Sequence, residues 1–300
     1  MNKKKLIWQL PFLLLLIVGT VLIIRQQRNM PYQKNSGMVF GTVYNLTYQC
    51  DSDLHEGIMA ELQKVDNSLS PFNEKSVITA VNQNREVVLD EMFLTVFKKA
   101  MTVSDDTQGA FDITVAPLVN AWGFGFKNGI EPTRQQVDSL RQIVGYKKVS
   151  LVDGKVIKQD PRMMLDCSAI AKGYGTDVVA NYLRSRGVKN FMVEIGGEIV
   201  TSGVNTQRLP WKIGVTKPTD DSLSVSNEIQ TILNVTDKAM ATSGNYRRFY
   251  YKDGQKFAHT IDPMTGYPVQ HSLLSATVLA KDCTTADAYA TSFMVMGIEA

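Results

Sequence analysis

The stretch "AIAKGYGTDVVANYLRSRGVKNFMVEIGGEIVTSG", residues 169–203, joins a helical pattern directly to a strand pattern. Its first half spaces apolar residues three and four apart and ends at Gly187, a typical helix stop. Its second half alternates around Gly196 and Gly197, which predicts two strands joined by a tight turn. Strands joined by a hairpin are antiparallel, so the stretch favours an α+β fold over a parallel one.

Further elements of both kinds flank this stretch. Helical spacing of apolar residues predicts helices over residues 58–69, 91–107, 133–145 and 284–297. Alternation predicts strands over 38–50, 85–90, 162–168, 211–218, 231–244, 247–262 and 273–280. Residues 148–160 are predicted to form a hairpin turning at Asp153-Gly154, and residues 109–126 begin as a loop. We therefore expect a mixed α+β fold with largely antiparallel sheets and flanking helices, in one body over residues 37–300.

Composition limits the class of protein. The chain has 300 residues, 44% of them hydrophobic and 20% charged, which is typical of a globular protein. Residues 1–34 hold six basic and no acidic side chains, against a net charge of +3 for the whole chain, so the remainder carries −3. A mildly acidic body does not suggest nucleic-acid binding. The three cysteines form no CxxC motif, which favours buried thiols, although one disulfide stays possible.

The N-terminal region is apolar. Leu6–Ile24 contains 19 residues without a charge and follows three lysines, and that length is sufficient for a helix to cross a bilayer. A cleaved signal peptide is the alternative, but no clear A-x-A site follows. We expect residues 1–36 to form a cytoplasmic tip, a transmembrane anchor and, from residue 26 to 36, a polar tether. Lysines before the span favour a body outside the cytoplasm.

Common catalytic signatures are absent. The sequence contains no G-x-x-x-x-G-K-[ST], no G-x-G-x-x-G after a strand, no H-E-x-x-H and no G-x-S-x-G. It holds only three histidines. These absences argue against a P-loop NTPase, a dinucleotide-binding dehydrogenase, a zinc protease and an α/β hydrolase.

The segment "LDCSAIAKGYGTD", residues 165–177, combines charge with small residues. Asp166 ends an apolar run, Lys172 opens a helix, and Gly173 and Gly175 lie in its first turns. Each glycine costs about 1 kcal/mol relative to alanine inside a helix, so a ligand or another backbone is expected to approach closely there. A helix N-terminus also favours anions. Ordinary strand-to-helix packing with a solvated Lys172 is the alternative.

Two further glycine-bearing segments have two interpretations each. "EIGGEI", residues 194–199, is either a tight hairpin or a place where the backbone approaches a phosphate or ring. "HTIDPMTGYPV", residues 259–269, has ordinary turn chemistry. His259 beside it is either a packed surface histidine or a catalytic base.

The segment "TTADAYATSFMVMG", residues 284–297, sets polar groups on an otherwise apolar helix. Thr284 and Asp287 fit a capping box, in which Asp287 only caps the helix. Asp287 and Thr291, four apart, also share a helix face and offer two oxygens to a hard cation such as Mg²⁺. Spacing alone does not decide between these interpretations.

Eight segments together resemble the ApbE family of FAD:protein FMN transferases. They are "FGTVY" (40–44), "LSPFNEKSVITAVN" (69–82), "GAFDITVAPLVNAWGFG" (109–125), "LDCSAIAKGYGTDVVANYL" (165–183), "VEIGGEIVTSG" (193–203), "ATSGNYRRFY" (241–250), "HTIDPMTGYPV" (259–269) and "ADAYATSFMVMG" (286–297). No single segment is decisive, and the signal is their order and spacing. The resemblance implies an ApbE-like fold related to the T-fold.

The resemblance also implies an activity. Such an enzyme cleaves FAD with Mg²⁺, releases AMP, and attaches FMN to a threonine or serine of a partner protein. The partner would be a flavin-carrying subunit of a Na⁺-translocating or related electron-transfer complex, on the periplasmic side of a bacterial inner membrane. Water in place of the partner hydroxyl would give an FAD pyrophosphatase, and loss of chemistry would give a membrane-tethered FAD-binding protein.

The resemblance places roles on individual residues. The family's metal ligands fall on Asp287, Thr291 and the backbone carbonyl of Ala169. Its FAD contacts fall on Phe40, Phe72, Ala110, Phe111, Asp112, Asp166, Lys172 and Ile261, with Gly196 and Gly197 beside the cofactor. His259, or an acid such as Asp262 or Asp287, would be the general base. Phe40 and Phe72 stand where relatives often carry Met and Tyr, so stacking is kept but the tyrosine hydroxyl is lost.

Overall fold

The computed structural model describes residues 3–125, 132–218, 228–245, 249–252 and 255–298. Its helices are α1 (Lys3–Asn29), α2 (His55–Leu69), α3 (Val77–Asn82), α4 (Glu91–Asp106), α5 (Ala116–Ala121), α6 (Arg134–Arg141), α7 (Ala171–Ser185) and α8 (Cys283–Met296), with a 3₁₀ turn at Tyr146–Lys148. Its strands are β1 (Tyr32–Val39), β2 (Thr42–Gln49), β3 (Val149–Val152), β4 (Lys155–Lys158), β5 (Phe191–Ile195), β6 (Glu198–Ser202), β7 (Trp211–Thr216), β8 (Ile229–Val235), β9 (Ala239–Gly244), β10 (Phe249–Lys252), β11 (Gln255–Ala258) and β12 (Ser275–Ala280). The predicted α+β class is confirmed.

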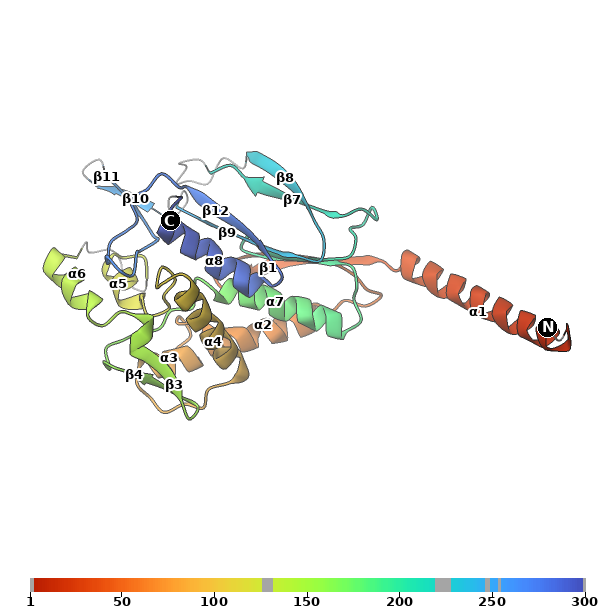
Figure 1. The fold of residues 1–300 in the computed structure, drawn as a ribbon, viewed down its shortest axis with the longest axis horizontal. Helices are drawn as coiled ribbons and strands as arrows, with labels where there is room; N and C mark the ends of the chain where they lie inside the picture. The colour runs from red at the N-terminus through yellow and green to blue at the C-terminus, as the bar shows by residue number, and fades with distance from the viewer. Residues whose placement is uncertain (1–2, 126–131, 219–227, 246–248, 253–254, 299–300) are drawn as a thin grey trace.

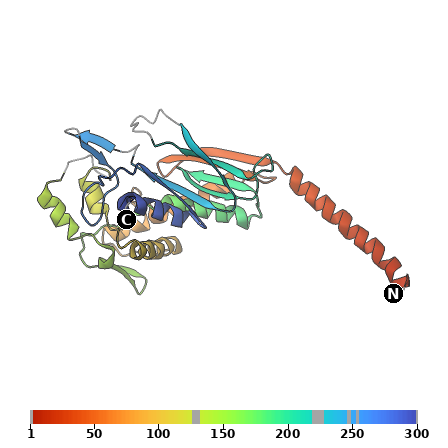
Figure 2. The same cartoon turned by 45° about the horizontal axis from the view of Figure 1, so that its top comes forward.

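A six-stranded antiparallel sheet organises the body, in the order β1-β2-β5-β6-β9-β12. Helix α7 packs on β5 and β6, and α8 packs on β9 and β12, so the two helices lie side by side on one face (Figures 1 and 2). The β7–β8 hairpin contributes Ile213 and Val235 to a cluster with Ile199 and Met240 of the sheet. The sheet therefore holds α7 and α8 in fixed register.

Two apolar clusters surround these helices. One joins α2 and α7 to the sheet and includes Leu62, Val179 and Phe191. The other joins α4 to the loops around residues 111–113 and 163–170, and it reaches α8 at Ala288. These clusters fix the segment that leads into α7, including the loop that carries Ala169.

The β1–β2 hairpin corrects two predictions. Residues 38–50, predicted as one strand, turn at Phe40 and Gly41, and residues 26–36, predicted as a tether, complete α1 and form much of β1. Phe40 and Gly41 have φ of +52° and +72°, the left-handed pair that a two-residue type I′ turn requires. Alternation continues on both sides of the turn, so the hydrophobic pattern does not reveal it. Strand β1 begins before the predicted boundary at residue 37.

Four other strand predictions need correction. Residues 231–244 divide into β8 and β9, and residues 247–262 contain β10 and β11 in place of one strand. Residues 85–90 and 162–168 form no strand. The backbone of Leu165 is satisfied by a side chain, because Asn82 both donates to its carbonyl and accepts from its N–H. Asp166 donates its N–H to the carbonyl of Ile113. Side-chain and loop partners thus replace the strand neighbours that the apolar patterns suggested. The predicted hairpin at 148–160 and the five predicted helices are confirmed.

Helix α1 contains the predicted anchor and projects away from the body (Figure 1). Among the described residues, no helix combines the length and the hydropathy that crossing a membrane requires. The side chains of residues 6–10, at the start of the predicted anchor, lie outside that described set. The prediction of a transmembrane helix is therefore not supported by the structure.

Candidate active site

The crossing of α7 and α8 forms the centre of the candidate site. A Cβ on Gly173 would lie 2.4 Å from the Cys283 carbonyl oxygen and 2.7 Å from Asp287 Cβ, so only glycine permits this approach. Asp287 is 1% exposed, and its Oδ2 accepts a hydrogen bond of 2.9 Å from the Gly173 N–H. That N–H lies in the first turn of α7, where the helix supplies no acceptor of its own. The sequence predicted that a ligand or another backbone would approach Gly173, and the structure shows the backbone of α8 there.

The start of α8 corrects the predicted capping box. The N-cap is Asp282, whose side chain accepts from the Thr285 N–H. Asp177 of α7 accepts from the N–H groups of Cys283 and Thr284 and from the Thr284 hydroxyl. Asp287 therefore does not cap its own helix, and its carboxylate faces α7 and Lys172.

Lys172 lies between two buried carboxylates. Its Nζ is 2.9 Å from Glu198 Oε1 and 3.8 Å from Asp287 Oδ1, and the lysine side chain is 32% exposed. Burial acts to lower the pKa of Lys172, but Asp287 and Glu198 outweigh it and raise that pKa. A charged lysine with an exposed flank at a helix start can bind an anionic group.

Glu198 is a component that the sequence analysis missed. It opens β6, its side chain is 3% exposed, and its Oε2 has no hydrogen-bond partner in the described structure. Burial raises the pKa of Glu198 to about 7, the charge of Lys172 opposes that shift, and Asp287 adds to it. The signal was present in "EIGGEI", because a carboxylate that begins a strand of buried residues requires a partner.

The predicted metal ligands offer hard oxygen atoms. Thr291 lies one turn after Asp287 on α8, and its Oγ1 is 3.1 Å from Ser243 Oγ of β9. Ala169 is half-buried in the turn before α7. Two buried carboxylates face one lysine, and one of their oxygens lacks a partner, so the cluster has an excess of negative charge that suits Mg²⁺. The described residues contain no cluster of three His, Cys, Asp or Glu side chains, so hydroxyl, carbonyl or water ligands would complete the shell.

The β1–β2 and β5–β6 turns, which both contain glycine, lie at the same end of the sheet. Gly196 and Gly197 join β5 to β6 with φ of +64° and +100°, which confirms the hairpin interpretation. The Gly196 N–H donates to the Val43 carbonyl beside the Phe40 turn. A Cβ on Gly175 would lie 2.7 Å from Phe40 Cε2, so the Phe40 ring packs on α7. The structure thus brings Phe40, Gly196 and Gly197 to the same end of the sheet, near the start of α7.

The side chains of the 110–112 loop are buried in the protein. Ala110 and Phe111 are 4% and 2% exposed, and Phe111 belongs to the core. Asp112 accepts hydrogen bonds from the N–H and hydroxyl of Thr114 and from the N–H of Tyr146. Burial raises the pKa of Asp112 although these bonds oppose the shift.

Asp166 precedes α7 in a tight turn. Its Oδ1 accepts from the N–H of Ser168 at 2.8 Å and from the Ser168 hydroxyl at 2.5 Å. Phe72 lies in the loop between α2 and α3 and is 72% exposed. Phe72 therefore lies largely at the surface, whereas Asp166 Oδ1 is occupied by Ser168.

The 259–269 loop carries two of the three candidate bases, His259 and Asp262. Both oxygens of Asp262 accept hydrogen bonds within their own turn, from the Met264 N–H and the Thr265 hydroxyl. That geometry matches the turn interpretation, because both Asp262 oxygens serve the turn. His259 is half-buried, with its ring centroid 6.4 Å from that of Phe124. Ile261 is 5% exposed in an apolar cluster, so its side chain belongs to the core.

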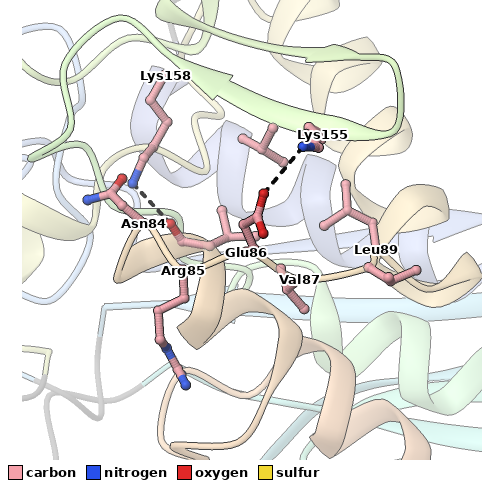
Figure 3. A pocket seen from close by; sticks show the side chains of 10 residues that line it. Asn84, Arg85, Glu86, Val87, Leu89, Lys155 and Lys158 are labelled. Atoms are coloured by element: carbon pink, nitrogen blue, oxygen red, sulfur yellow. Dashed lines mark hydrogen bonds and ion pairs between the residues drawn. The ribbon is translucent and has the colours of Figure 1, made fainter.

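Two hollows lie outside the α7–α8 crossing. One of about 550 Å³ lies between residues 84–89 and the β3–β4 hairpin, where Lys158 donates to the Val81 carbonyl and Lys155 pairs with Glu86 (Figure 3). It contains none of the predicted site residues. A smaller one of about 340 Å³ is lined by Asp112, Tyr146 and Pro263 among others, and so joins two of the segments predicted to contact FAD.

Comparisons with known proteins find similar proteins over most of the chain. A family model described as the ApbE family matches residues 40–300. A FAD:protein FMN transferase of Vibrio cholerae is 41% identical over 88% of this chain and 81% of its own length, and one of Haemophilus influenzae is 38% identical over 87% and 80%. The solved Flavin Transferase ApbE from Vibrio cholerae has a TM-score of 0.82 and 39% identity, and covers 90% of this chain and 88% of its own. The Pseudomonas stutzeri flavinyl transferase ApbE has a TM-score of 0.81 and 29% identity, over 90% and 86%.

Proposed function

The chain belongs to the ApbE family and is a flavin-transferring enzyme, and from that premise we propose the details of its reaction. It uses FAD and Mg²⁺, attaches FMN to a threonine or serine hydroxyl of a partner flavoprotein, and releases AMP. The single observation that carries the site assignment is the cluster of Lys172, Glu198 and Asp287 at the start of α7. It offers a cation for the pyrophosphate beside oxygen ligands for a metal.

The residues divide the work. The Lys172 ammonium and the start of α7 bind and orient the anionic pyrophosphate. Asp287, Thr291 and the Ala169 carbonyl would hold Mg²⁺, which when bound neutralises phosphate charge. The acceptor hydroxyl oxygen bonds the FMN phosphorus, the pyrophosphate bridge opens, and AMP leaves with the bridging oxygen.

His259 is the proposed general base and takes the proton of the acceptor hydroxyl. This assignment rests on the resemblance and on the occupied oxygens of Asp262. A solved His-to-Gly mutant of the Vibrio cholerae flavin transferase also directs attention to a histidine.

Product analysis tests the reaction. The full chain is incubated with FAD and Mg²⁺, with and without a flavin-carrier domain, and products are separated by chromatography. Covalent flavin on the carrier together with AMP is expected. AMP and free FMN without the carrier would indicate the pyrophosphatase, and bound FAD without AMP would indicate a binding protein. Absence of covalent flavin on the carrier would overturn the proposal if an established transferase flavinylates the same carrier in parallel.

The cellular setting is also proposed. Three lysines before an uncharged segment support a body held outside the cytoplasm at the inner membrane. The acceptor would then be a flavin-carrying subunit of a Na⁺-translocating or related electron-transfer complex. Protease protection in spheroplasts provides the test, because a body that is digested only after the cytoplasm is opened would contradict this location.

A further inference from the structure

The Lys172 ammonium lies closer to one of its two neighbouring carboxylates than to the other. Its Nζ is at hydrogen-bond distance from Glu198 Oε1, at 2.9 Å, but 3.8 Å from Asp287 Oδ1. Asp287 uses its other oxygen, Oδ2, to accept from the Gly173 N–H. One oxygen of Asp287 is therefore close to a lysine without being hydrogen-bonded to it.

Glu198 maintains this distance. A lysine side chain has four rotatable bonds and three donors, so an ammonium without its partner moves to the nearest carboxylate. For Lys172 that carboxylate is Asp287. A direct ammonium–carboxylate bond would occupy Oδ1, the oxygen left for a cation because Oδ2 already accepts from the Gly173 N–H.

The cost of burying Glu198 supports a specific role. Its side chain is 3% exposed and its Oε2 has no partner within the described residues, so the carboxylate is buried with half of its bonding capacity unused. An uncharged residue would pack there at lower cost, because a buried ion pair seldom stabilises more than an apolar replacement. The charge of Glu198 is thus best explained by what it does to Lys172.

We propose that Glu198 is a positioning residue that holds the Lys172 ammonium away from Asp287, so that Asp287 stays available to a divalent cation. This inference rests on the proposed function, because it takes Asp287 as a metal ligand. It assigns Glu198 no direct contact with the metal.

The test measures Mg²⁺ affinity of the full chain by calorimetry at pH 8, where Glu198 is ionised, and does not depend on turnover. Glu198→Gln keeps the shape and removes the charge, so Lys172 is expected to compete for Asp287 and weaken Mg²⁺ binding by about tenfold or more. Glu198→Gln/Lys172→Met removes the competitor and should recover wild-type affinity. Glu194→Gln is the matched control, since Glu194 lies on the same hairpin but pairs with Asn45.

Three outcomes overturn the inference. Unchanged Mg²⁺ affinity in Glu198→Gln would show that the lysine does not compete. Persistent weakness in the double variant, with a wild-type thermal midpoint, would mean that Glu198 acts on the ion directly. If the wild-type chain itself binds no Mg²⁺, there is no affinity for Glu198→Gln to weaken. That result would contradict the metal assignment of the proposed function, and with it this inference.

Discussion

Asp177 and Asp287 cap each other's helices. Asp177 on α7 accepts the N–H groups of Cys283 and Thr284 at the start of α8, and Asp287 on α8 accepts the Gly173 N–H at the start of α7. Each helix thus satisfies some of the unpaired N–H groups at the start of the other. The orientation of Asp287 toward Lys172 follows from this reciprocal arrangement and not from local helix geometry.

Removing Asp177 should loosen the pair of helices. Asp177→Ala leaves two N–H groups and the Thr284 hydroxyl without an acceptor, which we expect to cost about 1–3 kcal/mol of unfolding free energy. Urea denaturation measures the loss. Asp138→Ala, which breaks only a surface pair with Arg141, should change stability by less than about 1 kcal/mol. Equal effects of the two variants would contradict a structural role for Asp177.

Gly173 should tolerate no side chain. Gly173→Ala drives a Cβ against the Cys283 carbonyl, which is backbone and cannot turn aside. We expect a loss of about 1–3 kcal/mol and slower AMP release, because α7 and α8 must separate. Gly175→Ala meets side-chain atoms, the end of the Phe40 ring and, at 3.8 Å, Leu62 Cδ2, which can shift more easily than backbone, so its thermal midpoint should fall less. A larger fall for Gly175→Ala would show that the close helix crossing is not the constraint.

Asp287 should be needed for chemistry beyond its capping role. Asp287→Ala is expected to abolish Mg²⁺-dependent AMP release and to cost about 0.5–2 kcal/mol for the lost cap of α7. Asp282→Ala removes the cap of α8 and should cost a similar amount while AMP release continues. Chromatography of AMP beside thermal melts separates the two effects. Full activity of Asp287→Ala would refute the metal assignment.

Thr291 and Ser243 allow a finer test of the metal shell. Their hydroxyls are 3.1 Å apart, so either substitution removes one hydrogen bond. Thr291→Val also removes the proposed ligand and should weaken Mg²⁺ binding by about tenfold, whereas Ser243→Ala should leave Mg²⁺ affinity near wild type. Calorimetric titration of both variants with Mg²⁺ measures the two affinities. Equally weakened Mg²⁺ binding in both would show that the lost hydrogen bond, and not a lost ligand, is the cause.

Much of the fold follows from local pattern, and its failures have local causes. Residues 148–160 carry both alternation and an Asp-Gly turn, so the hairpin was predictable. Phe40-Gly41 lacks such a signal, because a bulky residue seldom adopts positive φ. Residues 162–168 have the apolar content of a strand, but Asn82, distant in the sequence, takes the hydrogen bonds of Leu165.

The candidate site was predictable in part. Asp287, Thr291 and Lys172 were identified by spacing and by resemblance, and the structure places Lys172 near Asp287. Asp177 was missed because its role depends on contacts with the start of α8, which no local spacing encodes. For Glu198 the sequence indicates only that a buried carboxylate needs a partner, and the fold identifies that partner as Lys172. The capping box was wrong because Asp282, one residue before the helix, already provides the cap.

Glu198 should give the metal-free protein a distinctive pH dependence. Its pKa is raised from 4.5 to about 7, chiefly by burial, so the folded chain binds a proton there that the unfolded chain has released. Unfolding free energy then falls as pH rises from about 4.5 to about 7, and it levels off above that range. The stabilisation that comes from this bound proton is fully present below the pKa of the unfolded chain, 4.5, and is lost as the pH rises through the pKa of the folded chain, about 7.

Glutamine at position 198 cannot titrate, so the variant Glu198→Gln lacks this contribution. As pH rises across the same range, the unfolding free energy of the wild type should therefore fall relative to that of the variant. Urea denaturation of both proteins at several pH values, with a chelator present, provides the measurement. Glu194→Gln should follow the wild-type curve, because Glu194 is paired with Asn45 away from Lys172. A wild-type curve that runs parallel to that of Glu198→Gln between pH 4.5 and 7 would mean that the buried carboxylate stays ionised throughout, held by Lys172 more strongly than burial opposes it.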